Sequence, residues 1–246
     1  MYIKEIELRL ESYPDKKEIE KIMQENQVSK QEAVYIWFEK CGKWTDRAFL
    51  LKCRNVAEYF ERMIPKLNLG DFWKISVVLF PKIETNERYI KPVSLCGNVW
   101  EYSLAYDEKK FENISELDFK KNALSALMEG LLFFCEEYNI DKQIFLDIEK
   151  SFIDGGYINK CLWKKKCSPV RHVYAELFYE LKPDRCDISV VIHDRDEVLY
   201  DNIIMTTEPS EWDFIKYLGD IKWLSKTKLN VTDKDKKSFF EIDIGM

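Results

Sequence analysis

The sequence is poor in the features that mark non-globular, membrane and secreted chains. Its 246 residues include only 8 glycines and 7 prolines, which excludes a collagen-like or glycine/proline-rich chain. The longest apolar run, Leu131–Cys135, ends at Glu136 and is far shorter than the roughly 20 residues that a membrane-spanning helix needs. The N-terminus alternates charged and apolar residues and lacks the apolar core of a signal peptide. We therefore expect a cytoplasmic protein that does not enter membranes.

Residues that carry common chemistry are also scarce. Histidine, the side chain most used for proton transfer at neutral pH, occurs only as His172 and His193. We expect these two histidines on different elements. A metal site needs several ligands that converge on one point, so the histidines do not indicate one. The seven cysteines include no Cys-x-x-Cys pair, which argues against zinc. Cys41, Cys53 and Cys135 fall on apolar faces of expected helices, where a free thiol acts as a small hydrophobe. The sequence predicts reduced thiols, no metal and no cofactor.

The motifs of common enzyme classes are missing as well. Neither of the two frequent glycine-rich phosphate loops occurs, and there is no Gly-x-Ser-x-Gly nucleophile elbow. The best thiol candidate is Cys167, five residues before His172 in a basic segment that would favour the thiolate. We therefore expect a protein that is not an enzyme, with a thiol-based enzyme as an alternative.

What the chain does contain is the material of a folded core. Hydrophobic residues make up 46% of it and aromatic residues 14%, a globular composition. Residues 1–12 alternate as in a half-buried strand, and Pro14 then opens a helix. Ser29 and Glu32 form the capping box of a second helix, with Gly42 as its expected stop. The later pattern predicts, in order, a helix over 46–64, strands over 73–80 and 99–106, helices over 115–138 and 141–154, strands over 173–181, 187–193 and 197–205, a helix over 209–218, and late strands near Leu224 and over 239–244 around a polar loop, 225–238.

The order of these elements indicates the fold class. Helices and strands come in groups rather than in strict alternation, which favours antiparallel sheet over βαβ crossovers. The short link Asn139-Ile140 predicts an antiparallel helix pair. We expect an α+β fold in which helical hairpins pack on antiparallel sheet. We also expect two subdomains, 1–112 and 113–246, the second containing the helix pair, a β-meander and a short helix.

A basic segment follows the expected helix pair. Residues 157–172 contain no acidic residue and five basic ones: Lys160, Lys164, Lys165, Lys166 and Arg171. We expect a solvated loop over 160–172. Because Trp163 lies among the lysines, a nucleic-acid-binding module is a second alternative. The acidic residues that follow would repel nucleic acid, so it is a disfavoured partner.

The negative charge of the chain is concentrated in one stretch. Residues 173–221 contain 12 acidic and 4 basic residues, although the whole chain carries a formal charge of only −6. Segregated charge is typical either of a solvated sheet face or of a docking surface for a basic protein. Trp212 and Tyr217 could act there as aromatic anchors or belong to the core. The residues that we expect to bind a partner are Asp194, Asp196, Glu197, Asp201, Glu208, Glu211 and Asp213.

Three segments within residues 115–225 carry a resemblance to a known family. They are Ser168-Pro169-Val170-Arg171-His172, the strand pair around 188–192, and Glu208-Pro209-Ser210-Glu211-Trp212 with Tyr217-Leu218-Gly219. This region resembles immunity proteins of bacterial polymorphic or contact-dependent toxin systems. The resemblance implies an acidic cytosolic α+β protein that inhibits one cognate toxin without catalysis. A basic nuclease domain is the kind of toxin that an acidic face would fit.

Overall fold

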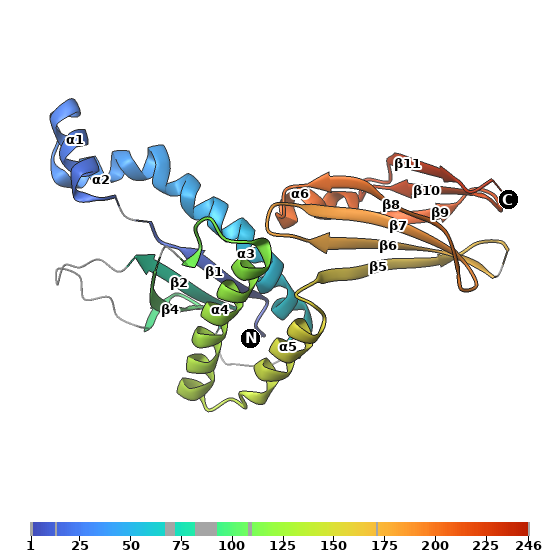
Figure 1. Ribbon diagram of the computed structural model, residues 1–246, viewed down its shortest axis with the longest axis horizontal. Coiled ribbons are helices and arrows are strands. Elements are labelled where there is room, and N and C mark those ends of the chain that lie inside the picture. Colours follow the sequence, from blue (N-terminus) through green and yellow to red (C-terminus); the bar gives the residue numbers. More distant parts are fainter. Residues whose placement is uncertain are drawn as a thin grey trace. The chain divides into compact units, whose positions relative to one another are not determined.

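The computed structural model describes residues 2–12, 14–66, 72–81, 93–107, 110–170 and 172–245. Helices and antiparallel sheets together confirm the α+β class. The chain divides into two compact units, Met1–Tyr157 and Ile158–Met246. In Figure 1 the first unit is coloured from blue to yellow and the second from yellow to red. The boundary predicted after residue 112 falls inside the first unit, because one hydrophobic core includes residues from Ile3 to Phe152.

The first unit is built on a mixed four-stranded sheet. Its elements are β1 (Glu5–Leu10), α1 (Lys16–Asn26), α2 (Lys30–Trp37), the π-helical turn η1 (Phe38–Gly42), α3 (Lys43–Met63), β2 (Lys74–Pro81), β3 (Val93–Cys96), β4 (Val99–Tyr106), α4 (Glu116–Tyr138) and α5 (Gln143–Asp154). The strand order is β1-β2-β4-β3. Helices α4 and α5 form the expected pair (Figure 1).

The strand directions in this sheet differ from the expected antiparallel arrangement. β1 runs parallel to β2, and β2 runs parallel to β4, whereas β3 and β4 are antiparallel. The long connection through α1, α2 and α3 returns the chain to the start of the sheet, so β2 can align with β1. Ile6, Ile75 and Trp100 line the sheet's buried face, with Phe60 of α3 and Leu131 of α4 in the same core.

Gly42 is not the helix stop that its position suggests. The capping box of Ser29 and Glu32 is confirmed, but the helix passes through η1 directly into α3. A Cβ atom on Gly42 would lie 2.5 Å from the indole ring of Trp37, so the glycine makes room for that ring. Cys41 in the same π turn is exposed rather than on an apolar face, because the extra residue per turn shifts the helix phase.

The second unit contains two antiparallel sheets. Its elements are β5 (Asn159–Cys167), β6 (Val173–Leu181), β7 (Cys186–Asp194), β8 (Glu197–Thr207), α6 (Glu211–Phe214), the 3₁₀ turn η3 (Ile215–Tyr217), β9 (Asp220–Trp223), β10 (Lys228–Thr232) and β11 (Ser238–Asp243). The sheet orders are β5-β6-β7-β8 and β11-β10-β9. Both sheets contribute to one core, in which Leu177, Val190, Ile221 and Val231 are buried.

Two expected loops in this unit contain strands. Most of the predicted basic loop is β5, a strand at the edge of its sheet. Lysines are common on edge strands because their charge prevents further strands from pairing there. The predicted polar loop 225–238 contains β10, because Leu229 and Val231 are buried and alternate with polar residues. The three strands of the predicted meander, by contrast, are confirmed within a few residues as β6, β7 and β8.

Candidate protein-binding surface

The structure places the seven predicted binding residues at two separate positions. Asp194, Asp196 and Glu197 surround the β7–β8 turn, and Asp201 follows on β8. Glu208, Glu211 and Asp213 come after the far end of β8, at α6. A strand rises about 3.3 Å per residue, so the two ends of β8 lie about 33 Å apart. The predicted residues therefore form two groups rather than one continuous patch.

The turn itself is a consequence of local chain geometry. Asp194 pairs with Glu197, and Arg195 between them adopts a left-handed φ of 53°. A two-residue hairpin with positive φ matches the right-handed twist of its strands. The turn directs Asp196 and Glu197 into solvent, and both are exposed.

Many acidic residues of the 173–221 stretch already have basic partners. The Nδ1 atom of His172 lies 2.6 Å from Oδ1 of Asp194. Asp187, which is only 3% exposed, accepts hydrogen bonds from Lys182 and Arg185. Other acidic residues of the stretch pair in the same way: Glu176 with Lys165, Asp184 with Arg185 and Asp220 with Lys164. Four acidic residues of this stretch thus have lysine or arginine partners within the unit, whereas His172 offsets the charge of Asp194 only when the imidazole is protonated.

Three of the predicted residues differ from these, and we name them the acidic edge: Asp196, Glu197 and Asp201. All three are exposed, and their carboxylates have no ion pair or hydrogen bond with another described residue. Val198 and Ile203 on the same strand are 53% and 56% exposed. Neither apolar residue was among the predicted binding residues, although the sequence of β8 carries apolar residues on both faces of the strand.

The second group surrounds an exposed aromatic side chain. Trp212 on α6 is 92% exposed, whereas Phe214 on the same turn is buried and stacks on Tyr179 with ring centroids 5.3 Å apart. Phe214 thus fixes the short helix to the core, and Trp212 remains in solvent. Tyr217, the other suggested anchor, packs edge-to-face against Phe239 beside the core. Trp212 is therefore the anchor candidate of the two.

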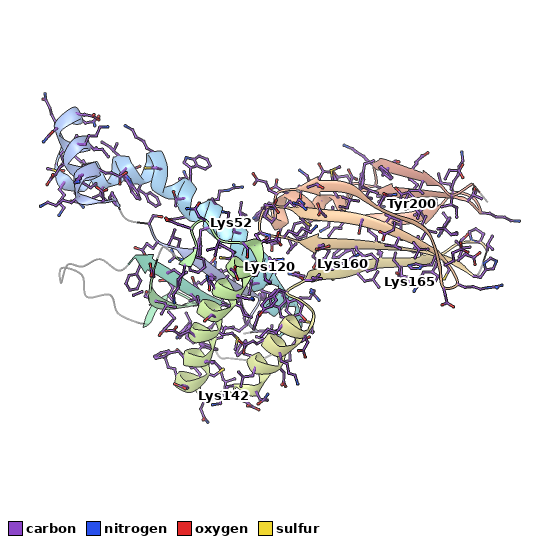
Figure 2. The ribbon with its side chains drawn as sticks, viewed as in Figure 1. Lys52, Lys120, Lys142, Lys160, Lys165 and Tyr200 are labelled. Carbon is purple, nitrogen blue, oxygen red and sulfur yellow. The ribbon has the colours of Figure 1, made fainter. Side chains whose placement is uncertain are left out.

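The basic strand β5 is held by its neighbours. Lys165 Nζ lies 2.8 Å from Glu176 Oε1 and 3.7 Å from the ring centroid of Tyr174. Lys160 lies over Phe178 at 4.7 Å, and both lysines can be followed along β5 in Figure 2. The glutamate hydrogen bond raises the pKa of Lys165 above its usual range. These contacts use charges that a nucleic-acid backbone would otherwise engage.

The two histidines, expected on different elements, lie just before β6 and on β7, at the same end of that strand pair. His193 stacks on Tyr174 at 4.8 Å, and its Nε2 atom lies 3.4 Å from Glu176 Oε2. Cys167 is the strand partner of Tyr174 from the other side. Within the described parts of the chain, no three His, Cys, Asp or Glu side chains are grouped so that they could hold a metal ion.

Comparison with other proteins adds no assignment. Neither a family model, a curated protein nor a solved structure matches the chain. Among the described residues, no helix has both the length and the apolar character to cross a membrane. The toxin-immunity resemblance stays a prediction.

Proposed function

We propose that this chain is a non-catalytic immunity protein of the bacterial cytoplasm that binds and neutralises one cognate toxin domain. The observation that carries the proposal is the acidic edge. Its three carboxylates lack basic partners among the described residues, while other acidic residues of the same sheet are paired. Exposed charge of one sign can complement an oppositely charged protein surface, and exposed apolar side chains beside it can add contact area.

The proposed partner is a toxin domain with a positively charged surface, such as a nuclease cleft. Complementary charges accelerate encounter and select the partner. Tryptophan is one of the side chains enriched among residues that dominate binding energy. Trp212, at 92% exposure, supplies a second contact beyond the acidic edge.

The test uses the protein encoded beside this chain's gene as the candidate toxin. The association rate is measured against salt concentration for the unaltered chain and for the double variant Glu197→Lys/Asp201→Lys. We expect the variant to associate about tenfold more slowly or worse and to lose most of the salt dependence.

Two other acidic residues of the same unit provide a matched control. Asp235 and Glu241 are exposed and have no partner among the described residues, and they belong to the β10–β11 hairpin of the other sheet. Asp235→Lys/Glu241→Lys changes the net charge by the same amount. If both double variants lose association equally, or neither does, the acidic edge does not select the partner.

A further inference from the structure

The two edges of the β5-β6-β7-β8 sheet are protected to different degrees. At the β5 edge, the indole Nε1 of Trp223 donates a hydrogen bond of 3.2 Å to the backbone carbonyl of Lys166. Lys164 Nζ, also on β5, lies 2.9 Å from Oδ1 of Asp220 on β9. The β5 edge thus combines lysines, a bulge after Leu162 and a neighbouring strand. These are the devices by which proteins prevent further strands from adding to a sheet.

Within the part of the chain that the structure describes, the β8 edge has bulges and charged side chains too, but it lacks the lysines and the ion-paired neighbouring strand of the β5 edge. Among the described residues, β8 pairs with β7 alone. Its sequence, Glu197–Thr207, contains no lysine, arginine or proline. Two bulges interrupt its pairing, one near each end, and between them 200–203 pairs regularly with β7. That regular segment presents an open strand edge with Asp201 at its centre.

We infer that the β8 edge is a docking site for an extended basic segment of the partner, which adds to the sheet as a fifth strand. Main-chain hydrogen bonds would supply affinity, and side chains at alternate positions would supply specificity. A lysine or arginine opposite Asp201 would form a favourable cross-strand pair. Val198 and Ile203 would contact apolar side chains of the incoming strand. The inference rests on the proposed function and names its binding mode.

Charge decides between this occupant and a second copy of the chain. Two β8 edges pairing with each other would bring Glu197 and Asp201 of one copy beside the same acidic residues of the other. Like charges opposite one another destabilise a strand pair. The acidic residues therefore oppose self-association at this edge and favour a basic strand from a different protein.

The experiment compares two synthetic peptides that differ only in their backbone. The first is a fluorescent peptide of about ten residues with the repeat Lys-Thr-Val-Thr, which puts lysine and valine alternately on one face, as Asp201 and Ile203 lie on one face of β8, and it is long enough to span the edge. The second has the same sequence with N-methyl groups on alternate residues, which remove the donors along one side. Binding to the full chain is measured by anisotropy at low salt, and amide exchange of β8 is followed by NMR. We expect the unmethylated peptide to bind at least about tenfold more tightly and to slow exchange of β8 amides.

The Asp201→Lys variant should lose binding of the unmethylated peptide, while Asp235→Lys should retain it. Equal binding of both peptides would overturn strand addition, since charge alone would then explain it. The absence of binding by either peptide, or protection at amides other than those of β8, would overturn it as well. Association with the toxin candidate is measured separately. If that association depends on Glu197 and Asp201 while the peptides fail, only the binding mode is wrong; if the peptides bind β8 but no toxin does, only the immunity function is wrong.

Discussion

The Nζ atom of Lys74 lies 2.6 Å from Oε2 of Glu7, across the parallel pair of β2 and β1. Ser76 donates to the other carboxylate oxygen of Glu7 at 2.8 Å, and Glu5 lies 2.7 Å from the same lysine. Burial alone would lower the pKa of Lys74, but the hydrogen bonds to Glu5 and Glu7 outweigh it and raise that pKa. The sheet face opposite the main core is thus held by a charged network.

Removal of the Lys74 ammonium group should lower the free energy of unfolding. Glu7 is only 9% exposed, so Lys74→Met leaves a nearly buried carboxylate without its closest cation. We expect a loss of about 3 kcal/mol in the free energy of unfolding, measured by urea denaturation. The double variant Glu7→Gln/Lys74→Met should recover part of that loss. A double variant less stable than the single one would contradict this account.

A close helix–sheet approach explains a glycine inside a helix. A Cβ atom on Gly130 of α4 would lie 2.3 Å from Cγ2 of the buried Val77 on β2. Alanine favours a helix by about 1 kcal/mol over glycine, yet overpacking costs about 1–3 kcal/mol. We expect Gly130→Ala to lower the thermal midpoint. In a Val77→Ala background the same change should raise it; a decrease in both backgrounds would rule out this clash as the cause.

The free energy of unfolding should decrease at acidic pH because of Asp187. Burial would raise the pKa of its carboxyl, but hydrogen bonds from Lys182, Thr206 and Arg185 outweigh that effect and leave the pKa below its usual value. A lowered folded-state pKa contributes stability above the unfolded pKa of about 3.9 and loses it as pH falls through the folded value. We expect Asp187→Asn to cost about 2 kcal/mol at neutral pH and to flatten the acid limb of the stability curve. Parallel curves for the two proteins would refute the assignment.

Thiol reactivity tests the enzyme alternative directly. Cys41 and Cys167 are exposed, whereas Cys53 and Cys135 are buried. Burial, with smaller contributions from Asp141 and Glu136, raises the pKa of Cys135 to about 11. We expect iodoacetamide to label the two exposed cysteines first, as read by mass spectrometry. At about pH 6, Cys167 should react no more than about tenfold faster than Cys41, its internal control; a much faster reaction would support a thiol-based site.

Much of the local structure was predictable because local patterns determine it. The capping box of Ser29 and Glu32 and the alternation along β6 are properties of neighbouring residues, and both predictions are confirmed. β5 could not be predicted in this way. Its sequence has consecutive exposed lysines and no apolar residue at every second position, so it resembles a loop. Its strand is stabilised by pairing with β6, a contact between residues distant in sequence.

The candidate site also has one property that the sequence determines and one that only the fold determines. The sequence alone determined that acidic residues concentrate between 173 and 221, since charge is a property of residue type. Only the tertiary structure decided which of them lie beside a basic side chain. Strand pairing and chain reversal place Lys165 beside Glu176 and His172 beside Asp194, but place no described base beside Asp201. An ion pair acts over a few ångströms, and distances on that scale between remote residues are fixed by the fold.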